Sequence, residues 1–458
     1  MLNESDLHGY QQRAVDFILA NRHAGCFIDL GLGKTVITYT ALVRLIDLAE
    51  VERVLVVAPK TVAETTWTEE SAKWSHLSHL RVIRVMGTEK QRIRALQSKA
   101  DIYVLGRDSF VWLVRYYKAR LPFDTIVLDE LTSFKSTTSQ RFKAFRLIRT
   151  QPDRIIGLTG TPAPNGYLDL FGQLYCLDGG ERLGKYKTKY IAAYFNTVTS
   201  SQGFILRASL KQGAKEEIEA KIADICISMK AEDYLQLPPY QEFARRVEFS
   251  PSLKKKYREF ERELVLACGD QEITASSAAA LANKLSQFSN GAVYDEDHMA
   301  HEIHSEKLQA LREIVEAAQS SSSSVLVFYQ YRHDIARISA TLKDVANEIR
   351  VYEGEQDFRD WNAHRIDVLL AHPASCAYGL NLQEGGHIIV WYGTGWNAEQ
   401  YEQANARLYR QGQKYPVIVY NLVCKDTVDE RALLAIQNKI DAQQALMAAV
   451  KELRKKWL

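Results

Sequence analysis

The sequence is poor in the features that mark secreted, membrane-bound and zinc-binding proteins. It has six widely spaced cysteines and no CxxC pair: Cys26, Cys176, Cys226, Cys268, Cys376 and Cys424. Such spacing is typical of reduced thiols, not of a disulfide framework or a zinc site. No apolar run approaches the roughly 20 residues that a membrane span needs, and the first ten residues lack a basic, apolar signal pattern. We therefore expect a soluble intracellular protein with no membrane partner.

The chain also lacks an excess of charge of either sign. Lys and Arg number 58 against 56 Asp and Glu, so the formal net charge is +2. This balance neither demands nor excludes a nucleic-acid partner, and any basic groove must be local. Hydrophobic residues make up 46% and charged residues 25% of the 458 residues, which is typical of a globular protein with a sizeable core. The length predicts about three domains, or two large ones.

Short runs rich in Val, Ile and Leu recur along the chain, and helical patterns separate them. The runs are GCFIDL, RVLVVAP, DIYVLG, DTIVLDE and RIIGLTG in the first half, and SVLVFYQ, DVLLAHP, HIIVWYG and PVIVYNLV in the second. They are continuous, not alternating, as in strands that are buried on both faces. The pattern predicts βαβ units and two parallel sheets, hence an α/β fold.

Between the two sets, from about Leu168 to Glu302, the chain has no such run and is rich in helix formers. We therefore expect helical insertions. The paired prolines of LQLPPYQ, Leu235–Gln241, resist both helix and central strand and give the best boundary. The prediction is a first lobe over residues 1–236, ending in a helical insertion, and a second lobe over residues 237–458, beginning with a helical protrusion. The chain from Ala435 onward predicts one long helix.

The stretch CFIDLGLGKTVITYTAL combines a strand-like run, a glycine-rich turn and a second apolar run. Phosphate binding needs backbone N–H groups that face one point, a helix N-terminus behind them and one fixed cation. Gly31, Gly33, Lys34 and Thr35 provide these, and the Thr35 hydroxyl would complete a Mg²⁺ shell. Because Ile28 stands where the usual phosphate loop has its first glycine, an ordinary strand–turn–helix corner remains the alternative.

A second apolar run, DTIVLDELTSF, ends in two adjacent carboxylates, Asp129 and Glu130. One carboxylate can hold the water shell of Mg²⁺, and the next can orient and deprotonate an attacking water. A solvated acidic pair at a strand end is the alternative. After a GKT sequence, and at the end of another buried strand, the catalytic interpretation is favoured.

Two further motifs could complete such a site. RIIGLTGTPAPNG places Thr159 and Thr161 at the end of a third strand, where their hydroxyls could sense the phosphates. EQANARLYRQGQK places Arg407 and Arg410 three residues apart, hence on one face if this piece is helical. Two guanidinium groups suit the charge that develops on a transferring phosphoryl group. A plain strand end and an exposed basic helix face are the alternatives.

Taken in order, the motifs resemble those of helicase superfamily two: HGYQQ, DLGLGKT, VLVVAPKT, LDELTSF, LTGTPAPN, SVLVFYQY, YGLNLQEGGHIIVWY and QANARLYRQGQ. More narrowly, they are similar to the Swi/Snf-type ATPases of chromatin remodellers and to their small stand-alone relatives in bacteria and phages. The likeness runs from Leu7 to about Thr427, and the Arg-x-x-Arg-x-Gly-Gln run is typical of that family. The resemblance implies two tandem RecA-like lobes and ATP with Mg²⁺ as cofactors.

The resemblance also implies residue roles. Gln11 would read the adenine edge, and the backbone of Gly31, Leu32 and Gly33 would surround the phosphates. Lys34 would hold the β- and γ-phosphates, Thr35 and Asp129 would bind Mg²⁺, Glu130 would be the general base, and Arg407 and Arg410 would be arginine fingers. A last set would contact the nucleic-acid backbone or couple it to the ATP site: Lys60, Thr61, Thr159, Gly160, Thr161, Gly379, Leu380 and Asn381.

The sequence departs from the family pattern after the paired carboxylates. Leu131 and Thr132 follow Glu130, where relatives usually have Ala and His, so the path that couples this motif to the nucleic acid is in question. Asp29 replaces the more usual Glu before the glycines. Trp67 and Trp74, which follow the APKT motif, are interpreted as core anchors of a helix, with base stacking as the alternative.

The function that the resemblance implies is a duplex-DNA-stimulated ATPase that moves along DNA and remodels protein–DNA complexes. The alternatives are a helicase that separates DNA or RNA strands, and a nucleotide-gated DNA-binding protein that does not hydrolyse ATP. A nuclease or a replication or recombination protein could use the motor as a partner. The stand-alone form implies the cytoplasm of a bacterium or of a phage-infected cell. The sequence leaves the oligomeric state open.

Overall fold

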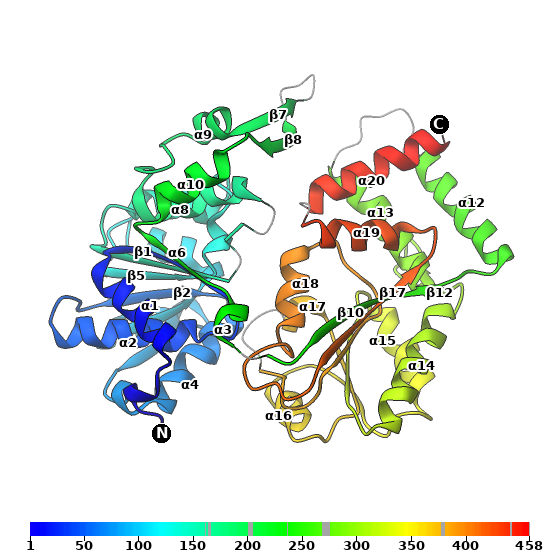
Figure 1. Ribbon diagram of the computed structural model, residues 1–458, viewed down its shortest axis with the longest axis horizontal. Coiled ribbons are helices and arrows are strands. Elements are labelled where there is room, and N and C mark those ends of the chain that lie inside the picture. The colour runs from blue at the N-terminus through cyan, green and yellow to red at the C-terminus, as the bar shows by residue number, and fades with distance from the viewer. Residues whose placement is uncertain are drawn as a thin grey trace. The chain divides into compact units, whose positions relative to one another are not determined.

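The computed structural model describes residues 1–160, 162–163, 166–199, 205–235, 237–267, 275–376, 381–439 and 442–457. The chain forms two compact units, Met1–Gln236 and Leu237–Leu458, and each contains its own parallel sheet flanked by helices (Figure 1). The predicted fold class, two tandem α/β lobes of the RecA-like kind with helical insertions, is confirmed. Each of the apolar runs named above forms a strand. Within the described ranges, no helix has both the length and the apolar character of a membrane span.

The first unit is built on a seven-stranded sheet in which all neighbouring strands run parallel. Parallel neighbours need long crossover connections, which here are mostly helical. Across the sheet the strands are β3 (Val82–Val85), β4 (Ile102–Gly106), β2 (Val54–Ala58), β5 (Thr125–Asp129), β6 (Arg154–Thr159), β1 (His23–Ile28) and β9 (Cys226–Met229).

Helices cover both faces of this sheet, because successive side chains of each strand enter two different cores. Cys26 and Val56 lie in the core beneath α1 (Gly9–Ala20), α2 (Lys34–Asp47), α3 (Lys60–Glu64) and α4 (Thr66–Lys73). Phe27 and Leu55 lie in the core beneath α5 (Glu89–Gln97), α6 (Phe110–Tyr116), α7 (Gln140–Ile148) and α8 (Leu170–Asp178). Strands that are covered on both sides explain the continuous apolar runs of the sequence.

The insertion at the end of the first unit is only partly helical. It contains the antiparallel hairpin of β7 (Phe195–Thr199) and β8 (Ile205–Leu210), with α9 (Lys187–Tyr194), α10 (Ala214–Ile222) and α11 (Ala231–Tyr234). The expected helical insertion is therefore present, but it also contains strands that the sequence analysis did not predict. β9 was missed because it is a four-residue edge strand that pairs only with β1 and alternates in burial, so it has no continuous apolar run.

The second unit has a six-stranded parallel sheet. Its strands, in order, are β10 (Tyr240–Val247), β17 (Val417–Cys424), β16 (Ile388–Trp391), β13 (Val325–Phe328), β15 (Val368–Ala371) and β14 (Ile349–Val351). The edge strand β10 is mostly exposed, which is why YQEFARRV does not resemble the buried strands and was missed. α14 (Glu306–Ser320) and α15 (Arg332–Leu342) share one core with the sheet. On the other face lie α16 (Glu355–Asn362), α18 (Ala398–Asn405) and part of α19 (Val428–Gln437), and α17 (Pro373–Cys376) follows β15.

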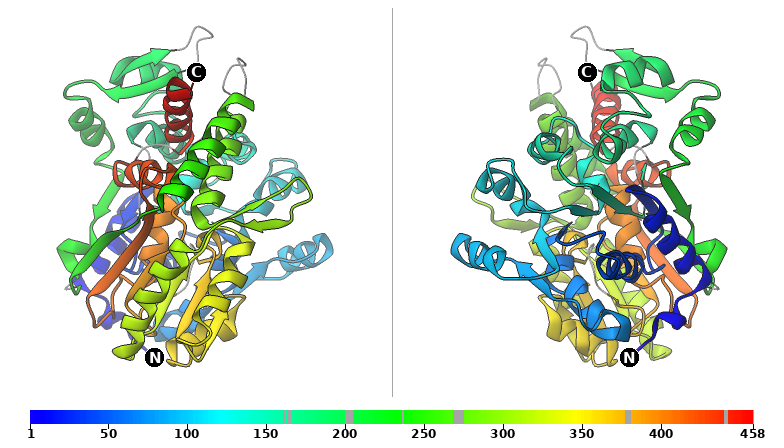
Figure 2. Two further views of the ribbon diagram at one scale, coloured as in Figure 1. Left: turned by 90° about the vertical axis from the view of Figure 1, so that its right-hand side faces the viewer. Right: turned by 90° about the vertical axis from the view of Figure 1, so that its left-hand side faces the viewer.

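A helical protrusion adds a separate small core to the second unit. It joins α12 (Pro251–Ala267), α13 (Ala275–Asn290) and α20 (Ala442–Trp457), which stay together in each view of Figures 1 and 2. The short hairpin of β11 (Ala292–Tyr294) and β12 (Ala300–Glu302) follows α13. The C-terminal region is two helices, so the prediction of one long helix was wrong. α19 ends where Asn438 caps the carbonyl of Leu434 and Lys439 adopts a φ of 50°.

Buried polar contacts tie this protrusion to the sheet. Lys307 of α14 is fully buried, and its Nζ lies 2.7 Å from Oδ2 of Asp429 and 2.9 Å from Oδ1 of Asn290. Asn290 also donates to Asp334, which caps the start of α15. Burial alone would lower the pKa of Lys307, but the charge and hydrogen bond of Asp429, together with the nearby Cys424 and Asp334, outweigh that effect and raise the pKa.

Replacement of Lys307 by Ala is expected to destabilise the second unit strongly. The carboxylate of Asp429 would remain buried without its cation, and breaking a buried ion pair in this way costs about 3–5 kcal/mol. The measurement is guanidinium denaturation of the full chain, with the midpoint of the transition compared between variants.

Lys254→Ala is the matched control, because Lys254 pairs with Asp426 in the same unit but at the surface. Exposed pairs contribute roughly 0–1 kcal/mol, so this variant should unfold close to the parent. Similar midpoints for the two variants would show that the Lys307 pair does not hold the unit together.

Candidate active site

Three neighbouring strands of the first sheet end at the same edge. β5, β6 and β1 are adjacent, with Asp129 opposite Leu158 and Thr159 opposite Phe27. Because the strands are parallel, the segments that follow them begin side by side. The glycine-rich loop after Ile28 and the paired carboxylates at the end of β5 therefore flank Thr159, although a hundred residues of sequence separate them. The carboxyl edge of a parallel sheet is where α/β proteins commonly bind ligands.

The loop between β1 and α2 has the backbone that its glycines predict. Gly31 and Gly33 have φ values of 87° and 82°, a region that residues with a side chain rarely adopt. Gly33 is the N-cap of α2, whose first residues are Lys34 and Thr35. The loop therefore leads directly into a helix N-terminus, which favours a bound anion.

Gln11 and Lys34 hold this loop from opposite ends. The Gln11 side chain is buried, its Nε2 donates to the carbonyl of Leu32 at 3.2 Å, and its Oε1 accepts from the backbone N–H of His8 at 2.9 Å. The Lys34 ammonium donates to the carbonyls of Ile28 at 2.8 Å and Asp29 at 3.3 Å. The predicted contact of Gln11 with adenine stays a prediction, and its position beside the loop is compatible with it.

The unusual Asp29 has a local explanation. Its Oδ2 accepts a hydrogen bond from the backbone N–H of Ala231, the first residue of α11, at 3.0 Å. The Asp29 side chain thus caps the start of α11, the helix that follows the edge strand β9.

Asp129 is buried and is held by a donor that sequence analysis placed only in the core. The indole N–H of Trp67 donates to its Oδ2 at 2.8 Å. Burial raises the pKa of the Asp129 carboxyl, and the Trp67 hydrogen bond and the charge of Lys34 oppose that rise.

Glu130 follows with a left-handed backbone, at a φ of 59° and a ψ of 66°. Residues other than Gly pay roughly 1–3 kcal/mol for such conformations, which cluster at functional sites. The next residue, Leu131, is fully buried and packs against Gly157 of β6, where even a Cβ atom would come within 2.6 Å of it. Leu131 therefore has a packing role at the position where relatives usually have a small Ala.

These residues fit a nucleotide with Mg²⁺. The loop offers backbone N–H groups at a helix N-terminus, Lys34 offers a cation, and the Thr35 hydroxyl and Asp129 carboxylate are oxygen ligands of the kind that Mg²⁺ prefers. Mg²⁺ usually keeps several waters and takes only one or two protein ligands, so two oxygens suffice.

The predicted nucleic-acid and coupling residues are only partly described. Lys60 is the first residue of α3, shortly after β2, and its side chain is largely exposed. Its Nζ lies 3.9 Å from Oε1 of Glu64. Thr159 is buried at the end of β6, and Gly160 follows it. Asn381 is exposed, and its carbonyl accepts from the amide of Asn362 at 2.8 Å. Thr161, Gly379, Leu380 and the side chain of Thr61 lie outside the described residues, so the calls on them stay predictions.

Arg407 and Arg410 belong to the second unit and are not on a helix. The shared helical face that their spacing would give in a helix does not form, because α18 ends at Asn405 and both arginines lie in the turns that follow. The Arg407 guanidinium is buried and its Nε donates to the carbonyl of Gln403 at 2.9 Å. These turns are anchored by Gln413, whose Nε2 lies within 3.2 Å of the carbonyls of Gln383, Gly386 and Leu408.

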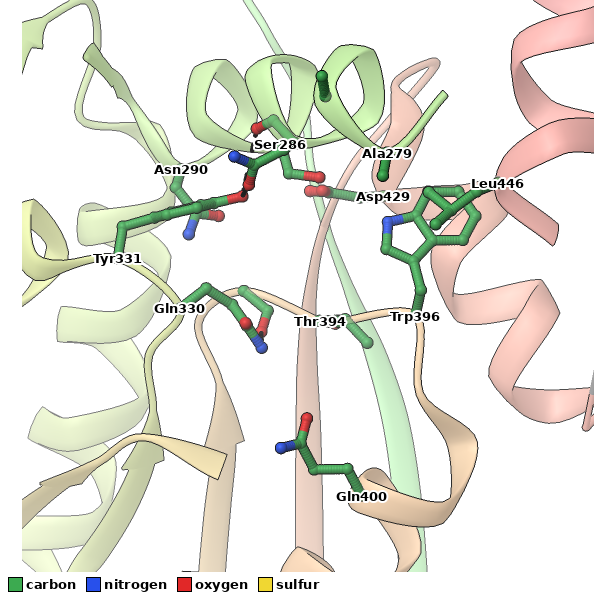
Figure 3. Close-up of a pocket in the computed structure, with 14 residues that line it drawn as sticks. Ala279, Ser286, Asn290, Gln330, Tyr331, Thr394, Trp396, Gln400, Asp429 and Leu446 are labelled. Atoms are coloured by element: carbon green, nitrogen blue, oxygen red, sulfur yellow. Dashed lines mark hydrogen bonds between the residues drawn. The ribbon is translucent and has the colours of Figure 1, made fainter. Parts of the chain in front are cut away.

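The second unit also contains a cavity of about 490 Å³ at the carboxyl ends of β13 and β16, beneath α13. Gln330, Thr394 and Gln400 line it with amide and hydroxyl groups, and the indole of Trp396 forms one wall (Figure 3). Neither arginine lines this cavity. It is therefore distinct from the turns that carry Arg407 and Arg410.

Sequence analysis missed the supporting roles of Trp67 and Gln413. A tryptophan seven residues after Lys60 has no signal in sequence that distinguishes a core anchor from a hydrogen-bond donor to a carboxylate. The family run that ends in Gly-Gln did contain Gln413, but only the structure relates its amide to the three carbonyls.

Gly33→Ala is expected to weaken nucleotide binding by about tenfold or more. A Cβ atom at Gly33 would lie 2.5 Å from Nε2 of Gln11, so the Gln11–Leu32 bond would break and the loop would shift. Hydrogen bonds to charged groups are worth about 1.5–3 kcal/mol, and the loop N–H groups would lose several. The measurement is titration with a fluorescent ATP analogue.

Gly213→Ala is the control. Gly213 is also a helix N-cap with a positive φ, 76°, but no atom lies within 4 Å of an added Cβ. Both variants should lose roughly 1–2 kcal/mol of stability from left-handed Ala, and only Gly33→Ala should lose affinity. Equal affinities would place the nucleotide elsewhere.

Comparisons with known proteins identify the family to which the chain belongs. A family model described as an SNF2-related domain matches residues 10–295, and one described as a helicase conserved C-terminal domain matches residues 306–412. A putative protein, p41, of Acyrthosiphon pisum secondary endosymbiont phage 1 is 34% identical over 455 residues, which are 96% of this chain and 98% of that protein.

More distant relatives are longer. An uncharacterized ATP-dependent helicase of Mycoplasma genitalium is 25% identical over 95% of this chain and 41% of its own length. The CHD3-type chromatin-remodeling factor CHR7 of Arabidopsis thaliana is 23% identical over 95% of this chain and 37% of its own length. This chain thus spans about two fifths of those two proteins.

Among solved structures, the SWI2/SNF2 ATPase core of Sulfolobus solfataricus in complex with double-stranded DNA is 20% identical, with a TM-score of 0.46. The match covers 98% of this chain and 96% of that one. The family assignment rests on the matched family model and on the phage relative: the chain belongs to the SNF2-related family of helicase-like ATPases.

Proposed function

We propose that the protein is an ATP-dependent translocase on duplex DNA, which couples ATP hydrolysis to movement and remodels protein–DNA complexes. The observation that carries this proposal is the edge of the first sheet. There the phosphate-type loop and the Asp129–Glu130 pair follow strands separated only by β6, in a chain of the SNF2-related family.

ATP would bind to the first unit through its phosphates. The N–H groups of the loop and the N-terminus of α2 would receive the phosphate oxygens, and Lys34 would exchange its two backbone carbonyl partners for the β- and γ-phosphates. Thr35 and Asp129 would hold Mg²⁺, which neutralises charge that develops on the phosphates. Gln11, fixed against the loop, would contact the adenine.

Hydrolysis would follow when Glu130 accepts a proton from the attacking water. Arg407 and Arg410 would stabilise the charge of the transferring phosphoryl group as arginine fingers. Because these arginines belong to the second unit and the loop to the first, turnover would require both units. Repeated closure and release around ATP would then move bound DNA in small steps.

Duplex DNA is the proposed substrate because of the family. The CHR7 relative is named as a chromatin-remodeling factor, and chromatin is built on duplex DNA. Lys60, Thr61, Thr159, Gly160, Thr161, Gly379, Leu380 and Asn381 are the proposed backbone-contacting and coupling residues. Contacts to the DNA backbone are largely independent of the base sequence of the DNA. Function in the cytoplasm, and a nuclease or a replication or recombination partner, belong to the same proposal.

Lys34→Ala and Arg410→Ala are each expected to lower phosphate release by about 10³-fold, the magnitude of a missing arginine finger. Glu130→Gln should lower it by roughly 10²–10⁴-fold, because the general base is lost. The measurement is the steady-state rate of phosphate release with saturating ATP and DNA.

Arg245→Ala is a suitable control, since this arginine of the second unit lies on the exposed edge strand and pairs with Glu313. Its rate should stay near that of the parent. Near-parent turnover in Arg410→Ala would show that the finger is misassigned. Absence of any turnover in the parent would favour the non-hydrolysing DNA-binding alternative.

Duplex DNA is expected to stimulate ATP hydrolysis more than single-stranded DNA or RNA of matched length. Affinity for the duplex should fall steeply with salt, because DNA phosphates that the protein neutralises release their counterions. The logarithm of the binding constant falls against the logarithm of the salt concentration with a slope of about −0.9 per phosphate contact. The measurements are phosphate release with each nucleic acid and fluorescence anisotropy at several salt concentrations. Greater stimulation by single strands, with unwinding of a forked duplex, would favour the strand-separating helicase, and a flat salt response would contradict backbone binding.

A further inference from the structure

Trp67 lies where three elements of the first unit meet. Its side chain, on α4, is fully buried, and its indole N–H donates to Oδ2 of Asp129 at the end of β5. The hydroxyl of Tyr39 donates to the backbone carbonyl of Trp67, and the two rings pack with centroids 4.9 Å apart. Tyr39 belongs to α2, the helix that begins at Lys34. Trp67 is therefore fixed from the helix behind the loop and reaches the carboxylate beside it.

The polar contact of Trp67 is more than its core position requires. Phenylalanine could fill most of the same space, but it has no donor for the buried Asp129 carboxylate. Trp74, the other tryptophan of this segment, offers a contrast, because it directly follows α4 and its indole N–H donates to Glu70 of that helix at 3.1 Å. Both rings are buried, and only one of them touches a residue of the proposed site.

The Trp67 bond restricts how the carboxylate can rotate. A carboxylate that binds a cation through water must present its lone pairs in a fixed direction, and an outer donor on one oxygen defines the plane of the group. The ring of Tyr39 and the surrounding core fix the indole in place. The Asp129 carboxylate that accepts its hydrogen bond therefore has little freedom to rotate.

We propose that Trp67 is a positioning residue that orients Asp129 for Mg²⁺ when ATP is bound. The inference rests on the proposed function, since it takes Asp129 as the residue that holds the cation. Loss of such a partner typically lowers metal affinity by about 10–100-fold. Trp67→Phe should therefore raise the Mg²⁺ requirement of the site and leave the Mg²⁺-independent part of nucleotide binding unchanged.

The test measures binding without turnover, in the full chain that carries Glu130→Gln. A fluorescent ATP analogue is titrated at increasing Mg²⁺ and again in EDTA, for this parent and for the parent with Trp67→Phe or Trp74→Phe. In Trp67→Phe the half-saturating Mg²⁺ concentration should rise about tenfold or more, and affinity in EDTA should match that of the parent. Trp74→Phe, the matched control, should behave like the parent in both conditions.

An unchanged Mg²⁺ requirement in Trp67→Phe would overturn the proposal, and so would an equal loss of affinity in EDTA, which would indicate general damage to the site. If Trp67→Phe does not give the circular dichroism of the parent, Tyr39→Phe takes its place under the same criteria, because it removes the bond that holds Trp67. A parent that binds no nucleotide with Mg²⁺ would overturn the proposed function itself. A parent that binds normally, with Trp67→Phe unchanged, would remove only the role of Trp67.

Discussion

The parallel pairing of β5, β6 and β1 is the constraint on which the proposed site depends. In a parallel sheet every strand ends at the same edge, so the register that sets Asp129 opposite Leu158 and Thr159 opposite Phe27 also sets the paired carboxylates near the glycine loop. Those strands are held in place by cores on both faces. The proposed chemistry at the edge thus depends on hydrophobic burial elsewhere in the unit, which brings short motifs that are far apart in sequence to one edge of the sheet.

The same division between core and edge holds in the second unit. Its sheet is fixed by two cores, and buried Lys307, which pairs with Asp429, also bonds to Asn290 at the end of α13 and so links the helical protrusion to the sheet. The turns that carry Arg407 and Arg410 are irregular and are held by the amide of Gln413. A turn fixed by side-chain hydrogen bonds can direct an arginine where a regular helix could not. Arg407 and Arg410 lie three residues apart, as on a helix, but their placement is a property of the turn.

The sequence predicted the buried strands and the loop because each has a strong local pattern. Continuous apolar runs predict strands that are covered on both faces. The closely spaced Gly31 and Gly33 predict the loop, and both adopt a positive φ in the structure. It could not predict β9 and β10, since edge strands carry polar residues and resemble loops. Nor could it predict that the C-terminal region breaks near Lys439. The hydrogen bond from Trp67 to Asp129 depends on tertiary packing alone, because no spacing rule relates two residues on different elements.

Under the proposed function, Trp67 would also link the segment proposed to contact DNA with the proposed ATP site. α3 begins at Lys60, α4 follows it after one residue, and Trp67 of α4 touches Asp129. This link would not need the histidine that the family resemblance leads us to expect at the position of Thr132.

In the proposed function, ATP hydrolysis at this edge moves the protein along duplex DNA. The most direct test is displacement of a triplex-forming strand from a blunt duplex by the full chain. Movement along the duplex should release the third strand in a reaction that requires ATP and is lost in Glu130→Gln. Absence of release from the triplex, under conditions where the protein hydrolyses ATP, would contradict it.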